Sequence, residues 1–178
     1  MSGRRGSGSG PFLMEMILVS GFFIICAALC VTVFVKADST SRRARDINQA
    51  VLAAETLAEE IEAGELEALG SGLPVPDRDF GKSLLEWEND EQRARRELIT
   101  SAGDFRSYAP VWDEEWNRYG DAGELHAAGK KLAYAAEVLC GTVDNIQMTE
   151  IAVMRYGSGS RDKGTVLYVL NADQYIKP

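Results

Sequence analysis

The sequence predicts an α+β protein in which one long N-terminal helix packs on a four-stranded antiparallel sheet. Two observations favour the helix. Met16–Val35 is an uncharged apolar run, and a charged stretch follows it in which apolar residues recur at three- and four-residue steps. A third observation favours the sheet, because from Asp104 onward short apolar stretches alternate with turn-forming residues. We therefore expect a membrane segment, a helical stalk and one small folded domain.

The uncharged run is long enough to cross a membrane. A helix rises about 1.5 Å per residue, so this run spans about 30 Å, the thickness of the hydrocarbon core of a bilayer. We therefore expect membrane lipid as a partner. Glu15 lies just inside the apolar stretch that begins at Pro11. An ionisable side chain in such a segment is a functional hypothesis by default, although a Glu near the edge can also simply reach the headgroup layer.

The residues around Glu15 carry a resemblance to a known family. A basic leader ends in Gly10, and Glu15 is the fifth residue of the apolar stretch that follows. This arrangement resembles the cleavage signal of type IV prepilins and type II secretion pseudopilins. The resemblance implies that a prepilin peptidase cuts between Gly10 and Pro11 on the cytoplasmic side. It also implies that Glu15 accepts a charge-assisted contact from the N-terminal amine of a neighbouring subunit, a role that suits a carboxylate in a low-dielectric environment.

The chain departs from this family at the first residue after the cleavage site. Pilins usually begin with Phe, whereas here Phe12 is second, behind Pro11. A Pro after the scissile bond disfavours cleavage, and its imino nitrogen disfavours the N-methylation that usually follows. This departure favours an alternative, an uncleaved single-pass membrane protein whose exported domain binds or senses a ligand. A membrane-tethered enzyme is a weaker second alternative.

Charge and orientation give further expectations. The chain has 19 Lys and Arg, 27 Asp and Glu, and a net charge of −8, which argues against nucleic acid as a partner. Basic residues after the uncharged run outnumber those before it, which would place the C-terminus in the cytoplasm. The resemblance implies the reverse, with the N-terminus cytoplasmic and the C-terminal domain extracytoplasmic. The basic residues after the uncharged run are Lys36, Arg42, Arg43 and Arg45, and the basic residues before it are Arg4 and Arg5.

The helix is expected to continue past the membrane. No Pro or Gly occurs from Ala37 to Ala63, and Gly64 is expected to end the helix. A second helix is expected over Phe80–Ser101, where Ser83 and Glu86 have capping-box spacing. The basic cluster at its rear reads as a solvated helix end that suits the helix dipole. The apolar positions of the first helix are Ile47, Val51, Ala54, Leu57, Ala58 and Ile61, and the basic cluster is Arg93, Arg95 and Arg96.

Four strands are expected in the C-terminal part. The first, Phe105–Trp112, contains Pro110 and is therefore expected at an edge. In the second strand, Lys131–Leu139, every second residue is apolar and lies on one face, which we expect to pack on the amphipathic helix. These residues are Leu132, Tyr134, Ala136 and Val138. The glycine-rich loop that includes Gly157–Ser160 is expected to join the last two strands. The second, third and fourth strands are Lys131–Leu139, Thr149–Tyr156 and Thr165–Leu170.

The sequence contains no catalytic constellation, so we expect a non-enzymatic protein without a cofactor. His126 is the only histidine, and Cys140 has no histidine close in sequence. Cys26 and Cys30 share a helix face and are expected to serve in packing rather than in metal or lipid attachment. Trp112 and Trp116 are expected to pack inside the domain rather than at a subunit contact. An acidic loop could hold Ca²⁺ but lacks regular ligand spacing, so a solvated loop is expected; it comprises Asp113, Glu114, Glu115, Asp121 and Glu124.

Together these inferences predict a pilin-like subunit that assembles with other pilin-like subunits into a type IV pilus, a pseudopilus of a protein-secretion system or a competence-type filament. Assembly would bury the helices formed by Phe12–Val35. The predicted parts are a leader peptide (1–10), a transmembrane helix (11–35), an amphipathic helical stalk (36–69), a connecting segment with a short helix (70–103) and an antiparallel sheet domain (104–178).

Overall fold

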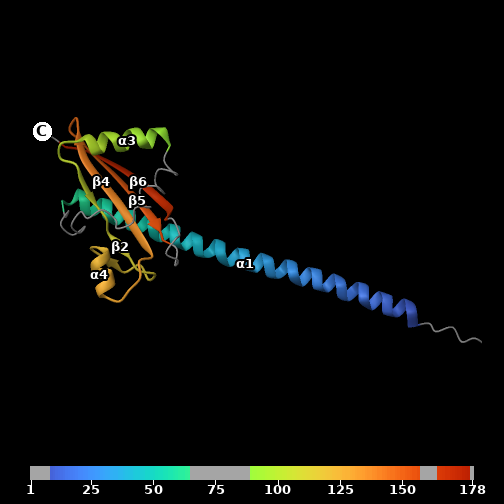
Figure 1. Ribbon diagram of the computed structural model, residues 1–178. Coiled ribbons are helices and arrows are strands. Elements are labelled where there is room, and N and C mark those ends of the chain that lie inside the picture. Colours follow the sequence, from blue (N-terminus) through green and yellow to red (C-terminus); the bar gives the residue numbers. More distant parts are fainter. Residues whose placement is uncertain (1–8, 65–88, 157–163, 177–178) are drawn as a thin grey trace, which may run out of the picture. The chain divides into compact units, whose positions relative to one another are not determined.

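The computed structural model describes residues 9–64, 89–156 and 164–176, and the chain forms two compact units, 1–45 and 46–178 (Figure 1). The α+β class predicted from the sequence is confirmed. The helices are α1 (Ser9–Glu62), α3 (Asp90–Ser101) and α4 (Ala122–Ala127). The strands are β1 (Arg106–Tyr108), β2 (Val111–Trp112), β3 (Arg118–Tyr119), β4 (Tyr134–Val143), β5 (Ile146–Arg155) and β6 (Thr165–Tyr175).

Helix α1 contains both the apolar run and the amphipathic stretch. It ends at Glu62, and Gly64 follows with a φ of 77°, a left-handed conformation that glycine adopts without steric cost. The end of the helix at Gly64 agrees with the sequence, whereas residues 65–69 of the predicted stalk (36–69) lie outside the described part, so that boundary stays a prediction. Within the unit 46–178, the buried positions of α1 recur at steps of three and four and form one stripe. They are Asp46, Ala50, Ala54, Leu57 and Ile61.

The sheet has six strands among the described residues, so the predicted count of four is wrong. All pairings are antiparallel, the order is β3-β2-β4-β5-β6, and β1 pairs with β4. The single strand expected over Phe105–Trp112 is two strands, because Pro110 has no N–H to continue the ladder. Arg118–Tyr119 adds another strand in a stretch predicted to be a turn. The predicted edge position holds for β1, whereas β2 lies between β3 and β4.

Strands β4 and β5 form the hairpin at the centre of the sheet. Their turn consists of Asp144 and Asn145, with φ angles of 51° and 64°. Two consecutive positive φ angles match the right-handed twist of the flanking strands, and Asp and Asn tolerate them better than most residues. The turn fixes the register in which Val143 lies opposite Ile146. Strand β5 consequently begins before the predicted start at Thr149.

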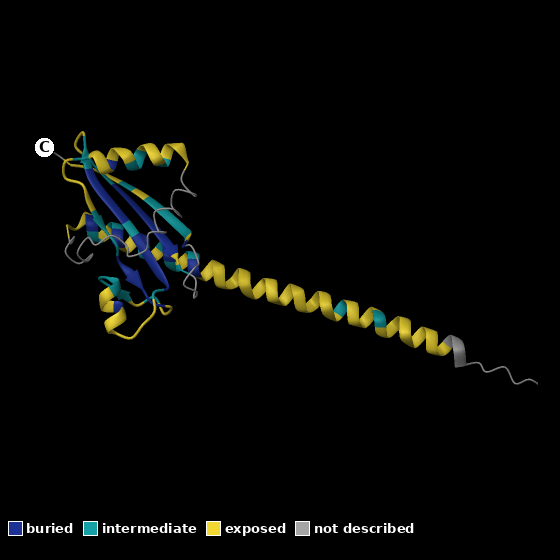
Figure 2. Ribbon diagram, viewed as in Figure 1, coloured by how far each residue is buried: buried dark blue, intermediate teal, exposed yellow. Residues whose placement is uncertain are grey.

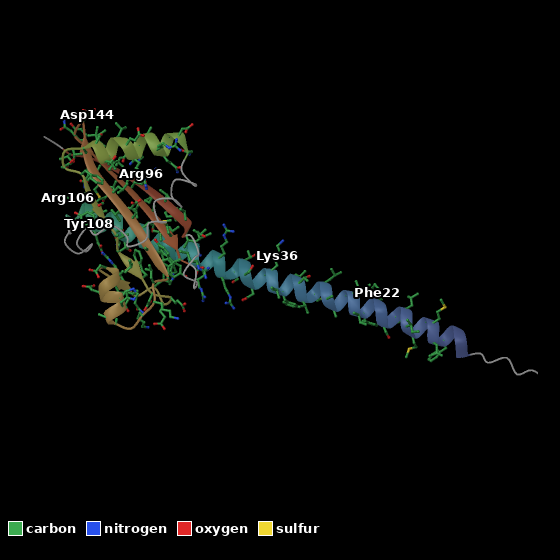
Figure 3. The ribbon with its side chains drawn as sticks, in the orientation of Figure 1. Phe22, Lys36, Arg96, Arg106, Tyr108 and Asp144 are labelled. Atoms are coloured by element: carbon green, nitrogen blue, oxygen red, sulfur yellow. The ribbon has the colours of Figure 1, made fainter. Side chains whose placement is uncertain are left out.

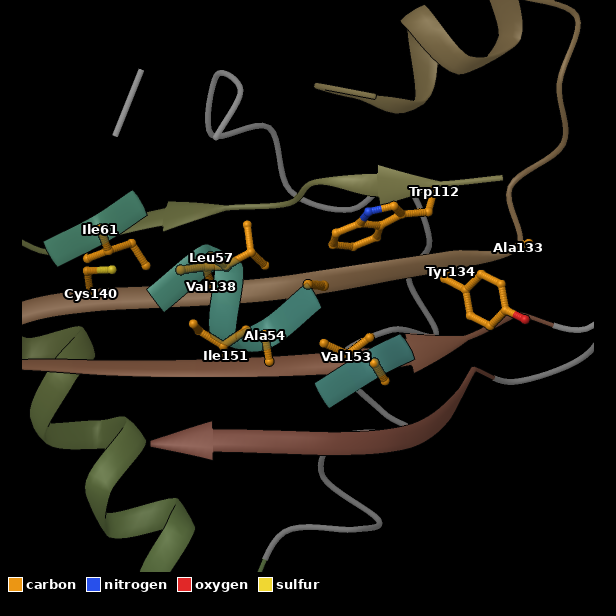
Figure 4. Close-up of a cluster of buried hydrophobic side chains, with 12 residues drawn as sticks. Ala54, Leu57, Ile61, Trp112, Ala133, Tyr134, Val138, Cys140, Ile151 and Val153 are labelled. Atoms are coloured by element: carbon orange, nitrogen blue, oxygen red, sulfur yellow. The ribbon is translucent and has the colours of Figure 1, made fainter. Parts of the chain in front are cut away.

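One face of the sheet packs on the buried stripe of α1, as predicted (Figures 2 and 4). Tyr134, Ala136 and Val138 lie in this cluster, whereas Leu132 precedes β4 and packs against a different cluster. Successive side chains of a strand point to opposite faces of the sheet, so Tyr134, Ala136 and Val138 lie on one face and the residues between them lie on the other. The cluster also includes Leu57, Ile61, Trp112, Cys140, Ile151 and Val153.

The other face carries α3 and the second apolar cluster, which comprises Val111, Leu125, Ala135, Ala152 and Met154. Helix α3 begins at Asp90 because Asn89 caps it: its side chain accepts from the N–H of Gln92, and Gln92 accepts from the N–H of Asn89. The predicted start at Phe80 is therefore wrong, and the pair Ser83 and Glu86 lies outside the described residues. Ile99 of α3 is fully buried.

Gly141 lets α3 approach the sheet closely. A Cβ at this position would lie 2.7 Å from the carbonyl oxygen of Ile99 and 2.8 Å from the Cβ of Ala102. Both atoms belong to the C-terminal end of α3, and one is backbone, so the helix would have to move.

We predict that Gly141→Ala lowers the free energy of unfolding by about 1–3 kcal/mol, because α3 is forced off the sheet. Gly103→Ala is the matched control, since a Cβ there meets nothing within 4 Å. Denaturant unfolding of the full chain in detergent, followed by tryptophan fluorescence, measures both. Equal stability of the two variants would contradict the close approach.

Candidate functional site

The apolar half of α1 is exposed along its whole length. Between Phe12 and Val35 only Gly21 and Cys26 are partly covered, and large apolar side chains such as Ile17 and Phe34 are 72% and 75% exposed (Figure 2). The segment reaches a mean hydropathy of 2.7 over an 18-residue window, none of it buried. A soluble surface seldom exposes so large an apolar area. This one helix near the N-terminus is consistent with a single-pass membrane protein.

Glu15 is an exposed carboxylate in the first part of this apolar helix. Residues one helical turn away from it include Phe12, Leu18 and Val19, all apolar. Among the described residues Glu15 has no ion pair, and the first basic residue after it along the described helix is Lys36. A carboxylate placed in lipid at this position would have no cationic partner on its own helix within the described range.

The other predicted site residues lie close to Glu15 in sequence. Gly10 and Pro11 form part of the first turn of α1, where a Pro is tolerated because its missing N–H has no intrahelical partner. The Phe12 side chain is 63% exposed, one helical turn before Glu15. These residues therefore occupy one helix end, with Phe12 and Glu15 three positions apart and so on neighbouring parts of the surface.

The two cysteines of the apolar segment have different surroundings. Cys26 is partly covered and Cys30 is exposed, one turn apart on α1. Phe22 and Phe23, which lie four and three residues before Cys26, contact each other edge to face with ring centroids 6.4 Å apart (Figure 3 labels Phe22). The predicted packing role of the cysteines stays a prediction, because Cys30 is exposed and Cys26 is only partly covered.

A buried carboxylate begins the part of α1 that packs on the sheet. Asp46 accepts a hydrogen bond from the Tyr134 hydroxyl at 3.0 Å and one from Arg155 at 2.7 Å. At the other end of the stripe Glu60 forms two bonds with Arg118, at 2.7 and 2.8 Å. These two contacts fix the position of α1 along the sheet. Sequence reasoning missed both, and the signal was Asp46 itself, which stands four residues before the first buried alanine.

Two arginines in the middle of α3 bind side chains of the sheet and are not solvated. Arg96 binds Glu150 at 2.7 Å and Glu137 at 2.9 Å (Figure 3 labels Arg96). Arg95 pairs with Asp173 and donates to the carbonyl oxygen of Thr149. The prediction of a solvated helix end is wrong for these two arginines. It failed because their carboxylate partners lie 41 to 78 residues further along the chain.

The acidic loop is a closed turn around Asp113. Asp113 is only 2% exposed, and it accepts bonds from the backbone N–H groups of Glu115 and Asn117, each at 2.9 Å. Burial raises its pKa, but hydrogen bonds from Asn117 and Glu115, with the charge of Lys130, bring it to about 2. The expected solvated loop is therefore wrong for Asp113. Asp121 instead caps α4.

Aromatic side chains pack next to the turn around Asp113. Trp116 stacks on Tyr134 with ring centroids 3.9 Å apart and lies 6.0 Å from Trp112, so packing within the domain is confirmed.

No group of three or more metal-ligating His, Cys, Asp or Glu side chains occurs among the described residues. His126, the only histidine of the sequence, lies in α4. Burial raises the pKa of the Cys140 thiol, which disfavours the nucleophilic thiolate.

Three comparisons with known proteins give no relatives: no family model, no curated protein and no solved structure matches this chain.

We predict that Asp46→Ala lowers the free energy of unfolding of the sheet unit by about 1–3 kcal/mol, because it leaves the buried Tyr134 hydroxyl without its acceptor. Asp46→Asn should lose less than about 1 kcal/mol, since it keeps an acceptor for Tyr134 and Arg155 is half exposed. Asp38→Ala is the control, because its pair with Arg42 lies in solvent. A loss as large in the Asp38 variant would refute the role of Asp46.

We also predict that the free energy of unfolding falls in acid, because the pKa of Asp113 is lowered in the folded chain. Its pKa is about 2 in the folded chain against an ordinary value of 3.8, so the unfolded chain binds more protons between these values. The stability that this group contributes is present above pH 4 and is lost as the pH falls toward 2. Unfolding curves at several pH values should show a smaller acid loss in Asp113→Asn than in the wild type. Parallel pH profiles would contradict the expectation.

Proposed function

We propose that this chain is a pilin-like subunit of a type IV pilus, pseudopilus or competence-type filament. A prepilin peptidase would remove residues 1–10 by cutting between Gly10 and Pro11. The remaining apolar helix, from Phe12 to Val35, would then pack laterally against the same segment of other pilin-like subunits. The protein would act as a structural component and not as an enzyme.

The observation that carries this proposal is the exposed apolar helix with Glu15 near its start. The helix carries no charge from Met16 to Val35 and exposes large apolar side chains, and no described residue pairs with Glu15. A bilayer covers such a helix but leaves the carboxylate poorly stabilised. Lateral assembly covers the helix and can also supply a charge, so it accounts for both features.

Cleavage would create the charge that Glu15 lacks. Hydrolysis of the Gly10–Pro11 bond gives Pro11 a secondary amine, which is protonated at neutral pH and donates hydrogen bonds. On an adjoining copy, this amine could meet the carboxylate of Glu15 in a medium of low dielectric, where a charge-assisted hydrogen bond is strong. Because the two groups are four residues apart on one helix, pairing between copies would set an axial offset between them.

The proposed orientation places the N-terminus in the cytoplasm and residues 46–178 outside it. This orientation follows from the position of the peptidase and runs against the count of basic residues, which is higher after the apolar run than before it. Pro11 supports a second candidate, an uncleaved single-pass protein whose exported domain binds a ligand. In that case Glu15 would lie at the headgroup layer and no amine would be released.

We predict that the protein isolated from its own cells has lost residues 1–10, and that Glu15→Gln abolishes detergent-resistant multimers while the protein stays in the membrane. Mass spectrometry of the intact protein and gel filtration in mild detergent measure the two effects. Glu55→Gln is the control, since it removes an exposed carboxylate of α1 from outside the apolar run.

Two outcomes separate the candidates. An intact N-terminus with normal multimers would reject processing but keep assembly. An intact N-terminus together with monomers that Glu15→Gln does not change would favour the uncleaved anchor.

A further inference from the structure

A basic ring follows the apolar segment on α1. Lys36, Arg42, Arg43 and Arg45 are all exposed, and Lys36 directly follows Val35 (Figure 3 labels Lys36). Asp38 pairs with Arg42 at 3.0 Å. The other three basic side chains have no acidic partner among the described residues. We call these four basic residues the collar.

We propose that the collar binds the phosphate groups of anionic membrane lipids. This inference requires that the apolar run lies in a membrane, but it does not require cleavage or filament assembly.

The arrangement of the collar around the helix favours lipid over a protein partner. Seven residues separate Lys36 from Arg43, about two turns, so these two share a face. Arg45 is nine residues from Lys36, two and a half turns, so it lies on the opposite side. A protein surface would meet only one side of the helix. A headgroup layer surrounds the helix and can neutralise charges on every side.

The distance of the collar from the apolar run also fits a headgroup layer. Along the axis Lys36 lies about 1.5 Å beyond Val35, and Arg45 lies about 15 Å beyond it. Long side chains on a helix point back toward its N-terminus, which here means toward the apolar run. The charged ends can therefore reach the lipid phosphates, or lie within about 10 Å of them, the distance over which salt screens charge.

The charge of the chain is divided in a way that fits this partner. Residues 1–45 carry a net charge of +4 and residues 46–178 carry −12, which together give the −8 of the chain. An anionic membrane attracts the first unit and repels the second. The acidic surface of a second copy is the competing partner for the collar, and the experiment below separates it from lipid.

The test uses the full, uncleaved chain purified in detergent that contains equal amounts of phosphatidylglycerol and phosphatidylcholine with the same acyl chains. Native mass spectrometry counts the lipids retained on each molecule. We expect the wild type to retain phosphatidylglycerol in at least about fivefold excess, the preference that one basic residue near the surface provides. High salt should reduce this excess.

Three variants make the test specific. Lys36→Gln/Arg43→Gln/Arg45→Gln should bring the ratio of the two lipids close to one, and Asp38→Asn should raise the excess by releasing Arg42. Arg93→Gln/Arg106→Gln/Lys131→Gln removes three exposed charges of the sheet unit and should leave the ratio unchanged. Equal retention of both lipids by the wild type would overturn the proposal. A second result would also overturn it: the wild type forms dimers, the collar variant does not, and the lipid ratio of the variant equals that of the wild type. The collar would then bind a second copy.

Discussion

The contact between the buried stripe of α1 and the sheet is the constraint on which the rest of the structure depends. Five side chains at steps of three and four, from Asp46 to Ile61, lie against the central hairpin of β4 and β5. The apolar members supply the burial, and the pairs at the two ends fix the helix along its axis. Because Asp46 is satisfied only by Tyr134 and Arg155 in their present positions, sliding α1 by one turn would leave a buried charge unpaired.

The same helix has a different character before Asp46. From Met16 to Val35 exposed apolar side chains lie on every side of the helix and no residue is charged, so no single stripe defines a partner. Only a bilayer or several neighbouring helices could cover such a surface. The collar then separates an apolar segment from an amphipathic one within a single helix. Along α1 an exposed apolar segment is therefore followed by an exposed basic segment and then by a segment that packs on the sheet. Under the proposed function the first of these segments would contact lipid or other helices.

The sequence predicted the parts of the fold that depend on periodicity. The apolar run, the amphipathic positions of α1 and the face of β4 that bears Tyr134, Ala136 and Val138 follow from residue spacing alone. The strand count and the positions of the arginines did not, because they depend on contacts between distant residues. The start of α3 at Asp90 depends on the local capping box of Asn89 and Gln92, which was not predicted. From the sequence alone, Arg96 is interpreted as part of a solvated helix end. Its partners Glu137 and Glu150 are distant in sequence and come close to it only in the folded chain. The roles of Glu15 and Phe12 stay predictions from the sequence. The contact of Asp46 was not predicted, because it depends on Tyr134, 88 residues away.

The central functional claim is that Glu15 of one copy meets the Pro11 amine of another. Zero-length cross-linking with a membrane-permeant carbodiimide, applied to cells that express equal amounts of light and heavy-isotope protein, tests it most directly. We expect a cross-linked peptide pair that joins the amine of Pro11 to the carboxyl of Glu15, with mixed light and heavy partners. Recovery of Glu15 only in unlinked peptides, with the N-terminal peptide still beginning before Pro11, would contradict it.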